Sequence, residues 1–149
     1  MSVLHLQGEI IVPGEASGAV LVSQEPLSFW GGYDQTSGEI IDRRHPLSGQ
    51  FAGGRILAIP ATRGSSTTTA VLLEAIRANT APIAFITRGT DHFLALASIV
   101  AEEMYGQAIP IVSLNAQAFE QLESGQWVVI GTNGFVNIES MAHGKEIDK

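Results

Sequence analysis

The chain has no cysteine among its 149 residues, and this absence excludes two kinds of architecture. Without thiols it has no disulfide framework, and it cannot supply thiolate ligands to zinc or to an iron–sulfur cluster. Its four histidines show none of the spacings typical of metal ligands. We therefore assign no metal site to this chain and expect any such cluster to be held by another chain.

Positive charge is also scarce. Eight Lys and Arg residues against fifteen Asp and Glu give a formal net charge of −7, and the longest basic run is the pair Arg43-Arg44. Nucleic acids and acidic membranes are therefore not expected as partners. The apolar runs are shorter than the roughly 18 residues that cross a bilayer, and the first residues lack the charged start of a signal peptide. We expect a soluble, cytoplasmic protein.

Hydrophobic residues, in contrast, are plentiful. They make up 45% of the sequence and charged residues only 15%, a composition that supports a substantial core. A chain of this length usually forms one domain. We expect a single domain over residues 1–149, with a β-rich part at 1–54, alternating strands and helices at 55–124, further β structure at 125–140 and a tail at 141–149.

Hydrophobic periodicity divides the chain into elements. Two β-type runs, 4–12 and 16–22, precede a long irregular segment at 24–54, and a loop of that length is usually functional or mobile. Strands are then predicted at 56–60, 83–87, 109–114, 127–130 and 135–138, with helices at 66–79, 91–106 and 115–124. Because strand–helix–strand units close as right-handed crossovers, this order predicts an α/β fold with a partly parallel sheet.

Two loops of similar composition follow neighbouring predicted strands. The first consists of Arg63, Gly64, Ser65 and Ser66, and the second of Arg88, Gly89, Thr90 and Asp91. Ligands of open α/β sheets bind at the edge where strands lead into helix N-termini. Glycine lets the backbone approach a ligand, and arginine can bind a carboxylate or phosphate bidentately. The loops favour an anion site, although serine and glycine are also ordinary caps and turns.

Three longer motifs are present: GEIIDRRHPLSG at 38–49, GRILAIP at 54–60 and RGSS at 63–66. Together they resemble the swivel-domain subunit of the aconitase X family, and the likeness extends through 71–74, 101–103 and 109–112. It covers most of the chain. As a set these motifs are far more specific than a Gly-Ser-Ser tripeptide alone.

The resemblance implies a swivelling β/β/α domain that docks on a larger subunit to form a heterodimer or a higher assembly. That subunit is expected to contribute substrate contacts and an iron or iron–sulfur centre. Members of the family are hydro-lyases that dehydrate cis-3-hydroxy-L-proline or mevalonate 5-phosphate. This chain, active only with its larger subunit, is expected to act on a small carboxylate, and its few cations favour cis-3-hydroxy-L-proline over a phosphorylated substrate.

The resemblance also implies roles for individual residues. In aconitases the first serine of a Gly-Ser-Ser-Arg loop is the base, which corresponds to Ser65. Thr67 stands where aconitases have a substrate-binding arginine, so Arg63 is the candidate to supply that charge. A serine acts as a base only where a helix N-terminus, nearby cations and exclusion of water stabilise its alkoxide. The candidate substrate contacts are Arg63, Gly64, Ser66 and Thr67, with Arg88 and Thr90 in a possible second loop.

The residues alone also allow other interpretations of the chain's function. A phosphohistidine carrier domain shares the swivelling fold but needs a histidine in the active loop, whereas His92 lies only at the next helix start. A non-catalytic module that binds small anions would use the same two loops. His45 is favoured as a loop hydrogen-bonding residue over an acid–base residue. The segment 30–34 and the His45-Pro46 turn either approach the cleft, contact the larger chain or pack over their own domain.

Overall fold

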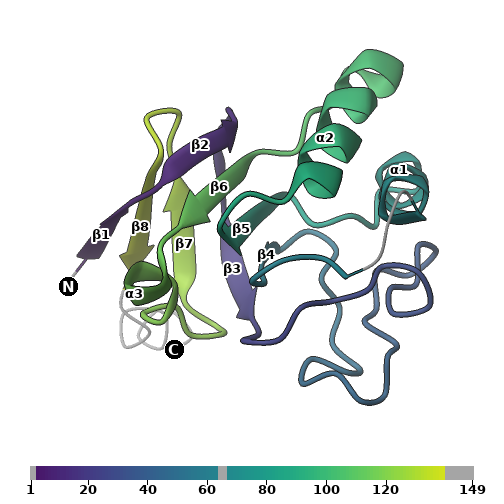
Figure 1. The fold of residues 1–149 in the computed structure, drawn as a ribbon, viewed down its shortest axis with the longest axis horizontal. Helices are drawn as coiled ribbons and strands as arrows, with labels where there is room; N and C mark the ends of the chain where they lie inside the picture. The colour runs from purple at the N-terminus through teal and green to yellow at the C-terminus, as the bar shows by residue number, and fades with distance from the viewer. Residues whose placement is uncertain (1–2, 64–66, 140–149) are drawn as a thin grey trace, which may run out of the picture.

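The computed structural model describes residues 3–63 and 67–139, and in this part of the chain eight strands form one mixed sheet (Figure 1). Along the sheet the order is β1-β8-β7-β3-β4-β5-β6-β2. The four central strands β3, β4, β5 and β6 are parallel, and every other neighbouring pair is antiparallel. The strands are β1 Val3–Gln7, β2 Glu9–Val12, β3 Ala16–Val22, β4 Ile56–Ala58, β5 Ala84–Arg88, β6 Ile111–Leu114, β7 Trp127–Ile130 and β8 Phe135–Glu139.

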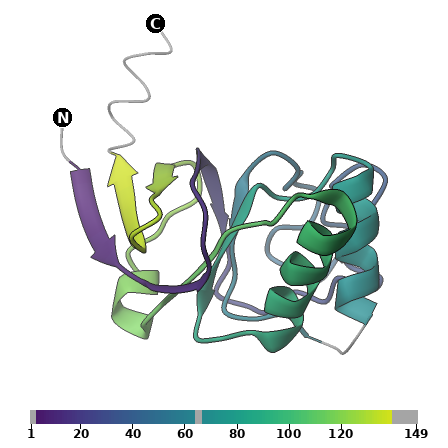
Figure 2. The same ribbon diagram turned by 90° about the horizontal axis from the view of Figure 1, so that it is seen from above.

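Two long helices cover one face of the parallel strands. These are α1 (Thr67–Arg77) and α2 (His92–Tyr105), while the single turn α3 (Ala116–Phe119) follows β6. Seen from above, the helices, the parallel strands and the antiparallel strands form three layers (Figure 2). One core lies between the helices and the sheet, and a second lies between the two groups of strands. The predicted β/β/α architecture with a partly parallel sheet is confirmed.

Strand β4 is a continuous apolar run because both of its faces are covered. Ile56 and Ala58 belong to the core between the strands, whereas Leu57 and Ile59 belong to the core under the helices. Since successive side chains of a strand point to opposite faces, a strand covered on both faces must be apolar at every position. This pattern places β4 and its loop in the middle of the fold.

The predicted run 4–12 divides into two strands at Gly8. β1 pairs with β8 and β2 with β6, so the two strands lie at opposite ends of the sheet order although one residue separates them. The Gly8 N–H donates to the Gly134 carbonyl oxygen at 2.9 Å. A Cβ atom on Gly8 would lie 2.2 Å from Cγ1 of Val112. Only glycine therefore lets the chain cross between the two ends of the sheet here.

Helix ends differ from the prediction by a few residues. α1 ends at Arg77, and Asn79 has a φ of 62°, which supports the predicted stop at that residue. α3 is shorter than the predicted helix 115–124. After Phe119 the N–H groups of Gln121 and Leu122 donate to the carbonyls of Ala118 and Phe119, three residues earlier, so the chain continues in tight turns instead of a longer helix.

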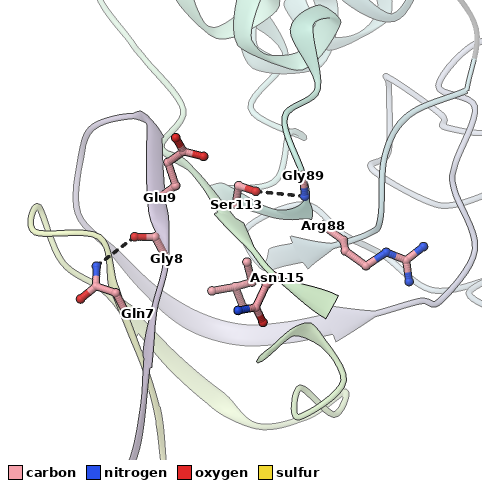
Figure 3. Close-up of a pocket in the computed structure, with 8 residues that line it drawn as sticks. Gln7, Gly8, Glu9, Arg88, Gly89, Ser113 and Asn115 are labelled. Carbon is pink, nitrogen blue, oxygen red and sulfur yellow. Dashed lines mark hydrogen bonds between the residues drawn. The ribbon is translucent and has the colours of Figure 1, made fainter. Parts of the chain in front are cut away.

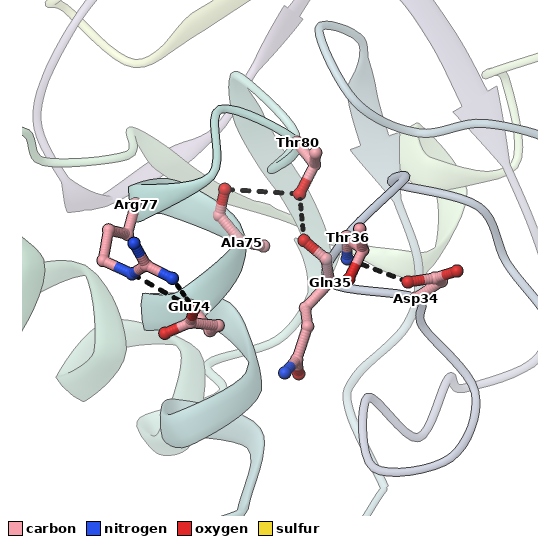
Figure 4. Close-up of polar contacts among 7 residues, drawn as sticks. All are labelled: Asp34, Gln35, Thr36, Glu74, Ala75, Arg77 and Thr80. Atoms are coloured by element: carbon pink, nitrogen blue, oxygen red, sulfur yellow. Dashed lines mark hydrogen bonds and ion pairs between the residues drawn. The ribbon is translucent and has the colours of Figure 1, made fainter.

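The segment 24–54 is irregular but packs over its own domain, with only isolated bridges in place of strands. The Tyr33 hydroxyl donates to the Thr80 carbonyl at 2.7 Å. The Thr80 hydroxyl donates to the Gln35 carbonyl at 2.6 Å (Figure 4). These bonds join the segment to the chain just after α1. Its side chains in the helix-side core are Leu27, Phe29, Tyr33, Ile40, Leu47 and Ala52.

Replacing Gly8 tests the crossover. We expect Gly8→Ala to lower the free energy of unfolding by about 1–3 kcal/mol, because the new methyl group overlaps Val112 and meets the Gly134 carbonyl. Urea unfolding measures the change. Gly18→Ala is the control, since its Cβ would meet mainly the flexible end of Ile83 at 3.1 Å. Equal losses in the two variants would contradict the role given to Gly8.

Because Tyr33 is buried, we expect the free energy of unfolding to fall at alkaline pH. Removal from water raises the pKa of the Tyr33 hydroxyl well above its usual value of 10. Above pH 10 the unfolded chain releases this proton and the folded chain keeps it, so stability falls by about 1.4 kcal/mol per pH unit. Unfolding measured at pH 9 and 11 should show a larger loss in the wild type than in Tyr33→Phe. An identical loss in both proteins would refute this assignment.

Candidate functional site

The loops after β4, β5 and β6 open at one edge of the sheet because these three strands are parallel. α1 and α2 begin at the same edge, since each follows one of these loops. The positive ends of the macrodipoles of both helices therefore lie at this edge. This is the edge at which the sequence predicts an anion site.

Asp91 joins the first two loops. Its Oδ1 accepts the N–H groups of Phe93 and Leu94, both at 3.0 Å, and so caps α2. Its Oδ2 accepts the Thr62 N–H at 2.6 Å and the Thr62 hydroxyl at 2.7 Å. The Asp91 residue is only 7% exposed. One buried carboxylate thus holds Thr62, the residue before the first loop, against the start of α2.

The second loop is also tied to β6. Gly89 has a φ of 99°, which favours glycine, and its N–H donates to Oγ of Ser113 at 2.9 Å. The Thr87 hydroxyl donates to the Gly89 carbonyl at 2.6 Å. The Arg88 N–H donates to the Pro60 carbonyl at 3.1 Å, which links this loop to the segment that follows β4. The second loop is therefore fixed beside residues 60–62, which lead into the first loop.

The structure places the predicted site residues as follows. Arg63 is exposed directly after Thr62 and donates its N–H to the Leu27 carbonyl at 2.9 Å. Thr67 is the exposed first residue of α1, Arg88 is the exposed last residue of β5, and Thr90 is exposed in the second loop. The remaining three, Gly64, Ser65 and Ser66, lie outside the described residues.

A polar depression of about 540 Å³ lies between the second loop and the segment 7–9, in which the chain crosses from β1 to β2 (Figure 3). Of the predicted site residues that the structure describes, only Arg88 lines it, and its guanidinium extends away from the segment 7–9. The segment 7–9 reaches the second loop because β2 pairs with β6. No local sequence motif predicts a pairing between strands so far apart in the chain. The lining residues are Gln7, Gly8, Glu9, Arg88, Gly89, Ser113, Leu114 and Asn115.

Sequence reasoning could have found Asp91 but gave it no role. Aspartate directly before an apolar-periodic segment is a typical N-cap signal, and α2 begins at the next residue. Its second set of bonds, to Thr62, depends on the tertiary fold and leaves no such signal.

Two histidines named from the sequence are now placed. Nδ1 of buried His45 accepts the Leu47 N–H at 3.1 Å, which is the loop hydrogen bonding favoured for this residue. Its Nε2 has no hydrogen-bond partner among the described residues. His92 is the exposed first residue of α2.

Neither a metal-binding group nor a membrane-spanning helix is found in the described part of the chain. Residues 3–63 and 67–139 contain no cluster of three or more His, Asp or Glu side chains that could hold a metal ion. None of the helices in these residues has the length and apolar character needed to cross a bilayer.

Comparison with known proteins identifies relatives. A model of the family described as aconitase X swivel domain matches residues 5–138. A cis-3-hydroxy-L-proline dehydratase of Pseudomonas aeruginosa is 50% identical over 117 residues, which are 78% of this chain but only 20% of that protein. A phosphomevalonate dehydratase small subunit of Methanosarcina acetivorans is 30% identical over 137 residues, covering 91% of each chain.

A solved structure is similar as well. The crystal structure of Thermococcus kodakaraensis aconitase X in its holo-form contains a chain that superposes with a TM-score of 0.82 at 32% identity. The match covers 92% of this chain and 99% of that one.

Substitution of Asp91 tests the hydrogen bonds that join it to Thr62 and to the start of α2. We expect Asp91→Ala to lower the free energy of unfolding by about 2–4 kcal/mol, because it removes a helix cap and leaves the Thr62 donors without their acceptor. Thr62→Val, which keeps the cap, should cost about 1–2 kcal/mol. Chemical unfolding of both variants measures the difference. A loss no larger in Asp91→Ala than in Thr62→Val would show that the cap contributes nothing.

Proposed function

The chain belongs to the aconitase X swivel domain family, and from this premise we propose that it is the small, swivelling part of a hydro-lyase that dehydrates a small carboxylate together with a larger catalytic partner. The observation that carries the proposal is the family match over residues 5–138. That match includes both loops, and Asp91 of the second loop binds Thr62, the residue before the first loop. The chain spans about a fifth of the Pseudomonas aeruginosa dehydratase.

The residues of this chain do not fit an iron–sulfur cluster, because the full sequence has no cysteine. We therefore place the iron or iron–sulfur centre of the enzyme in the larger partner. Dehydration needs a base for the carbon-bound proton and an acid for the leaving hydroxyl. This chain supplies the base, and the larger partner supplies the acid.

Ser65 is the proposed base, and its Oγ accepts the carbon-bound proton. It stands two residues before Thr67, the first residue of α1, in a chain segment preceded by the exposed Arg63. A helix N-terminus and a nearby guanidinium both stabilise an oxyanion and so lower the pKa of the hydroxyl. Closure of the larger partner over this edge would exclude water and strengthen both effects.

The remaining loop residues are proposed to hold the substrate. Arg63 binds the carboxylate in place of the arginine that aconitases have at the position of Thr67. Gly64 permits close approach of the backbone, and the hydroxyls of Ser66 and Thr67 donate hydrogen bonds to the same anion. Arg88 and Thr90 extend the site from the second loop, whose backbone is bonded to Pro60 in the segment after β4.

The favoured substrate is cis-3-hydroxy-L-proline. The 50% identity to a dehydratase of that name supports it, and so does the small number of arginines in the two loops, Arg63 and Arg88, because a phosphorylated substrate needs more cationic contacts. The alternative is the small subunit of a phosphomevalonate dehydratase. It is supported by the mutual 91% coverage with such a subunit, which is a separate chain of similar length.

Reconstitution with the larger chain from the same organism tests the base. We expect Ser65→Ala to lower kcat about 100- to 10,000-fold, the usual contribution of general acid–base catalysis, while the complex still assembles. Both substrates should be assayed. The control is Ser17→Ala, an exposed position on β3, which should keep wild-type turnover.

Three results would contradict parts of the proposal. Wild-type turnover in Ser65→Ala would exclude this serine as the base. Dehydration of mevalonate 5-phosphate but not of cis-3-hydroxy-L-proline would select the alternative substrate. Binding of a small carboxylate by the isolated chain, with no turnover by any reconstituted complex, would favour a non-catalytic binding module.

A further inference from the structure

Helix α2 carries an exposed apolar surface, which we call the α2 stripe. Its central residue Leu96 is 48% exposed, and Met104 is 60% exposed. The members recur at spacings of three and four residues and so lie on one side of the helix. The α2 stripe consists of Phe93, Leu96, Ile99, Val100 and Met104.

This pattern is unusual for a helix that covers a sheet. The buried side of α2 already packs into the core through Leu94, Ala97 and Ala101. A surface helix normally presents polar residues on its opposite side, whereas here apolar side chains extend over most of its length. Contiguous exposed apolar surface of this kind marks an interaction site.

We propose that the α2 stripe is a docking surface for the larger catalytic partner, an inference that rests on the proposed function. Its position supports this occupant. Phe93 lies in the first turn of α2, and its N–H is bound by Asp91, which also holds Thr62 in the first loop. The stripe therefore begins at the edge where the candidate site lies, and a body that closes over that edge reaches the stripe as well.

The size of the partner also supports this assignment. In the Pseudomonas aeruginosa relative the matched region is 20% of the protein, so most of that chain lies outside it. A stable interface buries about 800 Å² on each side. A partner several times larger than this domain can cover the candidate edge and the length of α2 together.

Charge argues against a second copy of this chain as the occupant. Glu102 and Glu103 are exposed beside the stripe near the end of α2, and the whole chain has a formal net charge of −7. Two copies packed stripe to stripe would bring like charges together, which disfavours the pair. The surface instead fits a partner whose apolar contact is bordered by Lys or Arg.

Titration calorimetry of the chain with its larger partner tests the surface. We expect Leu96→Glu to raise the Kd at least about 10-fold, because a carboxylate would be buried without a partner at the centre of the contact. Trp127→Glu is the matched control, since Trp127 is also 48% exposed but lies on β7 in the other layer. It should leave the Kd within about 2-fold of the wild type. Thermal unfolding of both variants verifies that each is folded.

The outcomes separate this inference from the proposed function. Turnover by the wild-type complex together with an unchanged Kd for Leu96→Glu would overturn the docking surface and leave the proposed function standing. No complex and no turnover with the wild-type chain would overturn both. Sedimentation of the isolated chain completes the test, because a dimer that Leu96→Glu dissociates would assign the stripe to a second copy.

Discussion

Four hydrogen bonds converge on the carboxylate of Asp91, and the edge of the fold that carries the candidate site depends on them. Two come from the backbone at the start of α2 and two from Thr62 in the preceding loop. A buried charge is costly unless such donors replace water, and the helix N-terminus adds a favourable potential. The same interaction that begins a helix therefore also holds the segment after β4 against the second loop.

The two loops on either side of the Asp91–Thr62 contact have different neighbours. On one side, the second loop is fixed to β6 through Gly89 and Ser113 and borders the polar depression near the β1–β2 crossover. On the other, the first loop leads into α1, and the segment that follows β3 runs beside it through the bridge of Leu27 with Thr62. A rigid backbone thus supports the exposed Arg63 and Arg88, which fits residues that bind and orient a ligand.

Much of the central architecture could be predicted from the sequence because local periodicity determines it. The strand at 127–130 has the predicted bounds, and α2 differs from its prediction by one residue at each end. Pairing between distant strands could not be predicted in the same way. Leu4 and Ile10 look like parts of one β run, yet they lie in strands at opposite ends of the sheet order, because steric space around Gly8 decides the crossover.

The same distinction holds for the candidate site. Its edge and its two loops follow from strand–helix order, which the sequence displays. The bonds between Thr62 and Asp91 and between Gly89 and Ser113 depend on how neighbouring strands are aligned, and no residue type encodes that alignment alone. The depression is less predictable still, since the segment 7–9 reaches it only through the pairing of β2 with β6.

The pairing of β1 with β8 also has a consequence for how the chain acquires its fold. Val3 lies opposite Glu139, so the first strand finds its neighbour only when nearly the whole described chain is present. Contacts between such distant residues slow folding, because a long loop must close before any of them forms. During synthesis on the ribosome β1 has to wait, and the antiparallel layer is completed last, after the helices and parallel strands of the candidate site can already assemble.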